Sequence, residues 1–236
     1  MRQICLDTET TGMHPDKGDR LVEIGCVEIV GRTLSDKPEH FYHQYINPER
    51  DVPADAVAVH GLTTERLAKE PIFSAIVDDF LAFITDAELI IHNAEFDVGF
   101  LNMELKKLKK GKIQDYCAKV TDSLAIAREM FPGLRNNLDV LCTRFNIDKS
   151  ERTLHGALLD AQLLAEVYLA MTRKQGSLLG EQYEAGEAIE PMPDASQLIV
   201  ATAPADELAL HREFIARIEK KCKTGAMWTK VLGTDT

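Results

Sequence analysis

The order of strand-like and helix-like segments is the feature that most limits how this chain can fold. Up to Ile46, apolar residues alternate or form short runs bounded by turn residues such as Gly31, which is typical of β-strands. After Pro71 the apolar spacing becomes helical, and helices alternate with short buried strands. We therefore expect an α/β fold, in which an antiparallel meander and parallel strands form one mixed sheet flanked by helices.

The same patterns predict the bounds of the individual elements. The expected strands are residues 3–7, 21–29, 40–46, 89–91 and 117–120. The expected helices are residues 72–83, 97–110, 123–130, 137–145, 157–173 and 206–223. In the second strand, Glu23 and Glu28 are expected near the solvent side or the strand ends, because carboxylates are seldom buried without a partner.

The composition changes near Lys174 and divides the chain into three parts. Residues 1–174 hold enough apolar sequence for one large domain. Residues 175–196 are rich in glycine, proline and acidic residues, as in a flexible linker. Residues 197–236 are too few for a core of their own, yet the helix that Asp206 would cap has an apolar side. This helix either docks on another protein or folds back on its own domain.

Charge, hydropathy and cysteine content exclude several classes of protein. The 236 residues contain no transmembrane-length apolar run and no secretory signal, so we expect a cytoplasmic protein. The five cysteines are odd in number and lack CxxC spacing, which favours reduced, mostly buried thiols. A net charge of -11 argues against a broad basic surface for nucleic acid. A small site where bound cations supply the positive charge stays possible.

Two carboxylates follow the apolar run Ile4–Leu6. Residues two apart in a strand share a face, so Asp7 and Glu9 project together. Carboxylates this close repel one another unless a positive charge lies between them. The pair is therefore either a solvated strand end or half of a cation site.

Two further acids favour the cation site. Asp160 shares a helix face with Leu163, Leu164 and Val167, and Asp97 has apolar residues at helical spacing. Neither has a lysine or arginine within one turn, and a lone buried carboxylate costs several kcal/mol unless it is paired or bound to metal. Oxygen ligands of this kind suit Mg²⁺ or Mn²⁺. Zinc is disfavoured, because no paired His/Cys spacing occurs.

His155 stands five residues before Asp160. Inside one continuous helix the two side chains would lie about 140° apart and would not share a face. Gly156 indicates a boundary, so we expect His155 in the preceding loop, where it can fold over the site. A single histidine of this kind is ordinarily a hydrogen-bonded surface or core residue. Beside a carboxylate cluster, a general-base role becomes credible, since its pKa lies near neutral pH.

Three motifs contain these residues: DTETTG at 7–12, HNAEFD at 92–97 and HGALLD at 155–160. In order and context they resemble the three motifs of the DEDDh 3′→5′ exonucleases, which have a ribonuclease H-like fold. Further segments are similar to the branch of that family formed by the proofreading ε subunits of bacterial DNA polymerase III. These segments are VTDSLA at 120–125, MFPG at 130–133, RNNLD at 135–139 and RTLH at 152–155.

The resemblance implies a two-metal mechanism that releases nucleoside 5′-monophosphates. It implies that Asp7 bridges two divalent ions, that Glu9 and Asp160 hold the ion carrying the attacking water, and that Asp97 helps to hold the second. His155 would accept the proton of that water. The terminal nucleotide would contact Asp55 of the segment PADA and His60 of the segment VHG. It would also contact Glu9, Thr10 and Thr11.

The resemblance also implies partners. The tail from Leu198 to Trp228 is similar to the segment that binds the polymerase α subunit, which favours docking for the helix within it. The family's clamp-binding peptide ends in an aromatic residue, but Gly180 stands at that position of QGSLLG, residues 175–180. We therefore expect weak or no binding to a sliding clamp. A small accessory subunit on the exonuclease domain is a further possible partner.

Three functions fit the sequence at this point. The first is a proofreading DNA exonuclease that acts in trans with a polymerase. The second is a free-standing DEDDh exonuclease that acts on RNA or single-stranded DNA ends. The third is a non-catalytic scaffold. The linker and tail favour the first, and the complete set of acids with His155 argues against the third.

Overall fold

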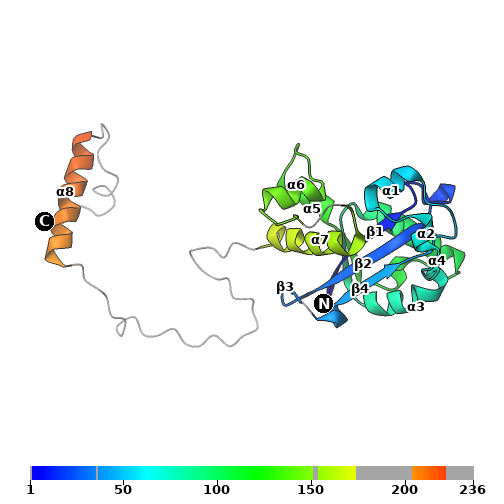
Figure 1. Cartoon of the computed structure of the whole chain (residues 1–236). Coiled ribbons are helices and arrows are strands. Elements are labelled where there is room, and N and C mark those ends of the chain that lie inside the picture. Colours follow the sequence, from blue (N-terminus) through cyan, green and yellow to red (C-terminus); the bar gives the residue numbers. More distant parts are fainter. Residues whose placement is uncertain (1, 36, 151–153, 174–203, 222–236) are drawn as a thin grey trace, which may run out of the picture. The chain divides into compact units, whose positions relative to one another are not determined.

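The computed structural model describes residues 2–35, 37–150, 154–173 and 204–221. The chain divides into two compact units, residues 1–175 and 176–236 (Figure 1). The linker expected at 175–196, which includes the peptide QGSLLG, lies outside the described residues. Of the segment expected at 197–236, only residues 204–221 are described.

One mixed sheet forms the centre of the first unit. Its strands are β1 (Gln3–Thr10), β2 (Leu21–Val30), β3 (Thr33–Leu34), β4 (Phe41–Tyr45), β5 (Glu88–Ile91) and β6 (Lys119–Asp122). The strand order is β3-β2-β1-β5-β6, and β4 pairs with β2. β2 is antiparallel to β1 and β4, whereas β5 is parallel to β1 and β6. The expected meander and parallel strands are confirmed; β3 was missed because two residues show no alternation.

Helices cover the sheet and frame its ends. They are α1 (Ala54–His60), α2 (Thr64–Leu67), α3 (Phe73–Ile84), α4 (Ala94–Lys107), α5 (Ser123–Met130), α6 (Leu138–Arg144) and α7 (Ala157–Met171). Asp122 caps α5 by accepting a hydrogen bond from the backbone of Leu124, and Asn137 caps α6 in the same way. The short helices α1 and α2 were not predicted. α4 begins three residues before the predicted start, so Asp97 lies in its first turn.

Alternation along β1 assigns its residues to two layers. Ile4 and Leu6 pack in one core with Phe80 of α3 and Phe100 of α4. Cys5 points the other way, into a cluster with Leu164 of α7. Figure 1 shows α7 along one side of the sheet and α3 by the other. The residues that follow in β1 keep this alternation, so Asp7 and Glu9 face α7 whereas Thr8 faces α4.

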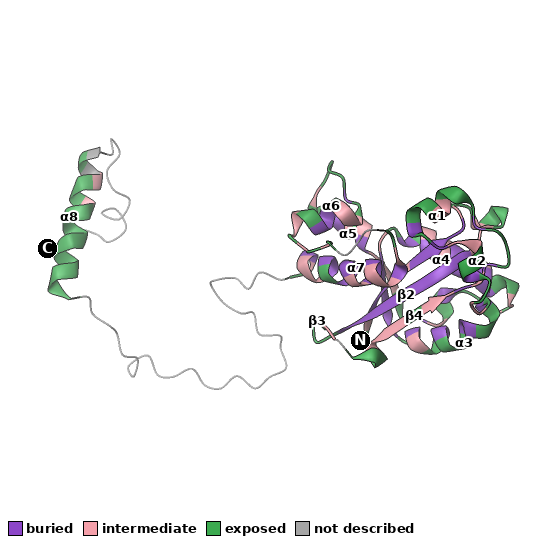
Figure 2. Ribbon diagram, viewed as in Figure 1, coloured by how far each residue is buried: buried purple, intermediate pink, exposed green. Residues whose placement is uncertain are grey.

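Glu23 and Glu28 were expected near the solvent side or the ends of the strand; each is the third residue from an end of β2, but both are buried, so the solvent-side expectation is wrong. β2 is an inner strand paired along both edges, and nearly all of it is buried (Figure 2). Each glutamate is instead satisfied by a neighbour. Glu23 accepts a hydrogen bond from His43 Nε2 at 2.7 Å. Glu28 pairs with Arg2 at 2.9 Å and with His40 at 3.2 Å.

The described cysteines agree with the expectation of buried thiols. Cys5, Cys26 and Cys117 are buried free thiols, and burial raises the pKa of each. Cys142 is buried as well. Cys222 lies outside the described residues.

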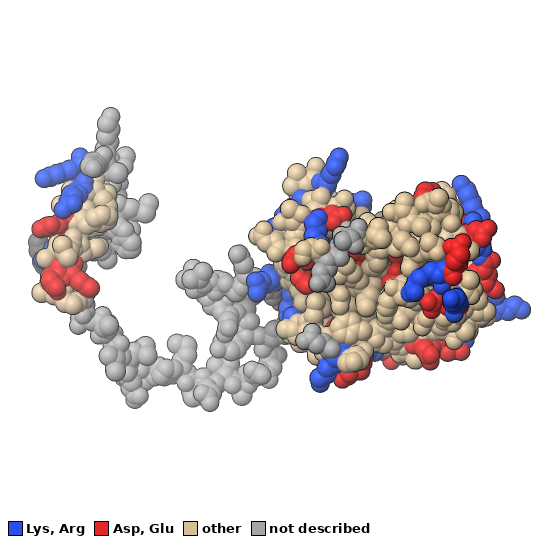
Figure 3. Space-filling view, viewed as in Figure 1, with Lys and Arg blue, Asp and Glu red and all other residues tan. Residues whose placement is uncertain are grey.

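On the face drawn in Figure 3, Lys and Arg side chains are interspersed with Asp and Glu. Among the described helices, none combines the length and the hydropathy that a membrane crossing requires.

The described part of the second unit is one helix, α8 (Ala205–Lys221). It matches the helix predicted at 206–223 to within two residues at each end. Its apolar side chains are exposed: Leu210 has 66% and Phe214 has 60% of its surface accessible. Leu208 is exposed as well, so this apolar side is uncovered within the described residues of its unit.

Candidate active site

The carboxylate pair of β1 lies where the strand approaches its end. Glu9 is buried and Asp7 is half-buried, and both side chains face α7. In the pairing with β2, Asp7 stands opposite Gly25 and Glu9 opposite Glu23. A register shift follows between Glu9 and Thr10. Bulges of this kind re-aim side chains and are frequent beside active sites.

Gly25 allows α7 to approach the carboxylates. A Cβ atom at this position would lie 2.3 Å from the carbonyl carbon of Ala157 and 2.3 Å from the amide nitrogen of Leu158. The first turn of α7 therefore rests directly on β2, opposite Asp7. The positive end of the helix dipole lies beside negative side chains, which stabilises them. A glycine inside a strand signals close backbone approach, and this signal was available in the sequence.

α7 completes a cluster with the end of β1. Glu9, His155 and Asp160 each place one possible ligand atom within 4.8 Å of the others. His155 Nδ1 lies 3.2 Å from Asp160 Oδ2. Asp160 is 3% exposed and His155 is exposed, in the loop before the N-cap Gly156. The predicted loop position of His155 is confirmed.

The end of α1 borders this cluster. The backbone amide of His155 donates a hydrogen bond to the carbonyl of Val59 at 3.1 Å. The next residue, His60, is buried, and its Nδ1 accepts a hydrogen bond from the backbone of Leu62 at 3.0 Å. Burial lowers the pKa of His60, and the nearby His155 acts in the same direction. Asp55, at the start of α1, is exposed.

Asp97 is held on the other side of β1. Its Oδ1 accepts a hydrogen bond from Thr8 Oγ1 at 2.7 Å, and Thr8 alternates with Asp7 and Glu9. Burial raises the pKa of Asp97 to about 7, against the opposing effect of the Thr8 hydrogen bond. The cluster that the geometry of the described residues shows consists of Glu9, His155 and Asp160. That Asp7 and Asp97 join these residues in one site stays a prediction.

Thr10 and Thr11 use their hydroxyls within the loop after β1. Thr10 Oγ1 donates a hydrogen bond to the carbonyl of Gly12 at 2.6 Å. Thr11 Oγ1 accepts one from the backbone of Arg20 at 3.0 Å, and the residue is 1% exposed. Both residues therefore shape the loop next to Glu9. Their contact with a nucleotide stays a prediction.

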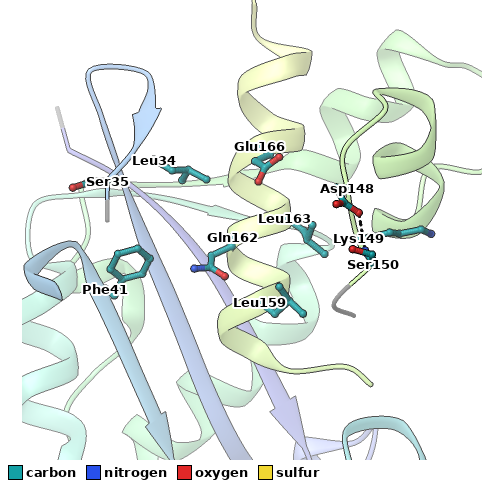
Figure 4. A pocket seen from close by; sticks show the side chains of 10 residues that line it. All are labelled: Leu34, Ser35, Phe41, Asp148, Lys149, Ser150, Leu159, Gln162, Leu163 and Glu166. Carbon is teal, nitrogen blue, oxygen red and sulfur yellow. Dashed lines mark hydrogen bonds between the residues drawn. The ribbon is translucent and has the colours of Figure 1, made fainter. Parts of the chain in front are cut away.

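A hollow of about 320 Å³ lies elsewhere on α7 (Figure 4). Phe41 of β4, Glu166 of α7 and Lys149 of the loop after α6 are among its lining residues. Burial raises the pKa of Glu166, and repulsion from Asp148 adds to this effect. None of the residues predicted for the site lines this hollow. The same helix thus turns Asp160 to the cluster and Glu166 to a separate surface.

Comparison with known proteins assigns the chain to one family. The model of the RNase_T exonuclease family matches residues 4–168, a range that includes α4 and most of β1 and α7. The chain belongs to this exonuclease family. It is 49% identical to the DNA polymerase III subunit epsilon of Salmonella typhimurium strain LT2, over 93% of this chain and 94% of that protein. Against the subunit epsilon of Escherichia coli strain K12 the identity is 48%, over 93% and 94%. Within the family, the exonuclease therefore groups with the epsilon subunits.

Solved structures share the fold of this exonuclease. The nuclease domain of 3′hExo, a DEDDh family member bound to rAMP, has a TM-score of 0.59 at 18% identity, over 72% of this chain and 90% of that chain. Exonuclease X in complex with 5′ overhanging duplex DNA has a TM-score of 0.53 at 19% identity, with the same coverage. The ribonuclease H-like fold expected from the motifs is confirmed. Exonucleases of the DEDDh type use divalent metal ions.

Proposed function

We propose that the chain is the proofreading 3′→5′ exonuclease of a bacterial DNA polymerase III, hydrolysing the 3′-terminal phosphodiester of DNA and releasing nucleoside 5′-monophosphates. The observation that carries this proposal is the grouping of Glu9, His155 and Asp160. Similarity to epsilon subunits over nearly the whole chain supports the polymerase context. A scaffold without activity would have no physical reason to bury two carboxylates beside a histidine.

The donor set of the cluster fits divalent cations with hard, oxygen-preferring chemistry. Glu9 and Asp160 would hold one ion, Asp7 would reach both ions, and Asp97 would approach the second, directly or through water. Because His155 would act as the base, the ligands would be carboxylates, and such oxygen ligands suit Mg²⁺ or Mn²⁺ better than zinc. When bound, such ions supply a Lewis acid for the attacking water and for the leaving 3′ oxygen.

His155 would accept a proton from the attacking water. A carboxylate can only accept hydrogen bonds, so the neutral ring donates from Nδ1 to Asp160 Oδ2 and its basic nitrogen is Nε2. Asp160 thus orients the ring and stabilises the imidazolium that forms. Because His155 precedes α7 and is exposed, its ring has access to solvent and substrate.

The terminal nucleotide would lie between the loop after β1 and the end of α1. Neutral His60, beside His155, would contact its sugar or base. Glu9, Thr10 and Thr11 would approach the 3′ end, the threonines through their backbone because their hydroxyls are engaged. Asp55 would contact the nucleotide only from the exposed start of α1.

The deciding experiment compares the wild type with the double variant Asp7→Ala, Glu9→Ala. We expect the wild type with Mg²⁺ to release 5′-monophosphates from DNA with a mismatched 3′ end, and the double variant to release none. Matched RNA ends serve as the second substrate. Equal activity on RNA would favour the free-standing exonuclease, and full activity of the double variant would refute the metal site.

The polymerase α subunit is the proposed partner of the C-terminal segment. The exposed apolar side of α8 supports this assignment. Deletion of residues 198–236 should leave nuclease activity intact and abolish co-purification with the α subunit. A truncated chain that still binds the α subunit would refute the assignment. The accessory subunit, the weak clamp contact and the cytoplasmic location stay predictions.

A further inference from the structure

A third carboxyl lies beside the cluster and has no role in the mechanism above. Glu23 occupies the position of β2 directly opposite Glu9 of β1, so the two side chains share one face of the sheet. It is 3% exposed. Its charge is close enough to His60 of α1 to act on the pKa of that imidazole. Glu23 therefore belongs to the floor of the active site.

Glu23 is held from the far side by β4. His43 Nε2 lies 2.7 Å from Glu23 Oε1, and since a carboxylate only accepts, the hydrogen is on Nε2. His43 stands opposite Gly25, and Tyr45 stands opposite Glu23. The rings of His43 and Tyr45 meet edge to face, 4.8 Å apart, which fixes the imidazole. One oxygen of Glu23 is thus fixed toward β4, away from β1.

Without a bound cation, the placement of Glu23 opposite Glu9 destabilises the folded protein. Like charges directly opposite on neighbouring antiparallel strands destabilise the pair, and burial adds a desolvation cost. The one hydrogen bond from His43 offsets only part of this. A cation bound by Glu9 and Asp160 would reverse the balance, because the third carboxylate then attracts the ion.

We propose that Glu23, held by His43, is a positioning residue of the metal site. Its repulsion turns the Glu9 carboxylate toward His155 and Asp160, and its charge strengthens cation binding without direct coordination. This inference rests on the proposed metal-dependent function. It adds a residue that lies in none of the three exonuclease motifs.

The test is the variant Glu23→Gln, which keeps the shape of the side chain and its bond with His43. We expect the dissociation constant for Mn²⁺, measured by titration calorimetry without substrate, to rise about tenfold. We expect kcat to fall at limiting Mg²⁺ and to recover at saturating Mg²⁺, with an unchanged KM for DNA. Glu23→Asp keeps the charge, so its Mn²⁺ affinity should stay closer to that of the wild type.

Glu28→Gln is the matched control. Glu28 is a buried carboxyl of the same strand that also pairs with a histidine, His40, but it lies toward the other end of β2. Its Mn²⁺ affinity should equal that of the wild type. Wild-type affinity in Glu23→Gln would overturn the proposal, and so would equal losses in Glu23→Gln and Glu28→Gln.

Stability without metal provides an independent readout. In EDTA, Glu23→Gln should have a higher Tm than the wild type, and this gain should vanish in a Glu9→Gln background. A Gln variant too unstable to purify would contradict the proposal, because relief of repulsion predicts a stable protein. Absence of Mn²⁺ binding by the wild type would instead refute the metal site itself.

Discussion

Replacement of Gly25 by alanine tests whether close packing of α7 on β2 assembles the active site. The added Cβ would lie 2.3 Å from the carbonyl carbon of Ala157 and 2.4 Å from its oxygen. These are backbone atoms, so no side-chain rotation relieves the overlap. Carbon atoms pack at about 3.5 Å or more, and the first turn of α7 must therefore move away by about 1 Å.

The size of the effect follows from that displacement. Overpacking of this kind costs about 1–3 kcal/mol, which lowers the Tm of a unit of this size by about 2–12 °C. The activity should fall more steeply, because a shift of about 1 Å in a catalytic group reduces turnover by about 100-fold. The shift carries Asp160 and His155 away from Glu9 together, so kcat should change more than the KM for DNA.

Gly99→Ala is the control for the assay. Gly99 lies inside α4, where an added Cβ meets only Pro15 Cγ at 3.9 Å. Alanine there should preserve turnover and keep or raise Tm, since it favours the helix. Excision of a 3′ mismatch, thermal unfolding and Mn²⁺ titration are measured for both variants. Wild-type turnover and Mn²⁺ affinity in Gly25→Ala would refute the assembly of the site by this contact.

Two further predictions concern His155 and Asp97. For His155→Ala we expect turnover to fall by about 100- to 10,000-fold with Mn²⁺ affinity largely retained, because the ring acts as a base; normal turnover would remove it from the mechanism. For Asp97→Asn we expect loss of activity together with higher stability of the metal-free protein. The pKa of Asp97 is raised from 3.8 to about 7, so the unfolded chain ionises first and Asp97 costs stability as pH rises through this window. The stability gain of Asp97→Asn in EDTA should therefore grow from pH 4 to pH 7 and then stay constant; a gain that shrinks over this range would contradict the burial argument.

The sequence was sufficient to predict the layout of the sheet and the shared face of Asp7 and Glu9. Strand alternation is local, so the pair could be placed without knowing what packs on it. The loop position of His155 followed from Gly156 in the same way. The C-terminal helix was also predicted closely, because a capping acid and apolar spacing are local signals.

The errors concern properties set by distant partners. Glu23 and Glu28 were expected near the solvent side or the strand ends, but both are buried, Glu23 beside β4 and Glu28 beside Arg2 and His40. The hydrogen bond that Thr8 donates to Asp97 was likewise not predicted. In each case the sequence shows the residue but not the element that comes to lie against it.

The packing of α7 on β1 and β2 also has a consequence for synthesis on the ribosome. The first strands of the unit hold Glu9, but Asp160 and His155 arrive with its last helix. The site is therefore completed only by contacts between the two ends of the unit, which form late in a chain made from its N-terminus. A nascent chain that ends before His155 lacks two of the three residues of the cluster. On the proposed function, we therefore expect nuclease activity only after α7 has been made and has packed on the sheet.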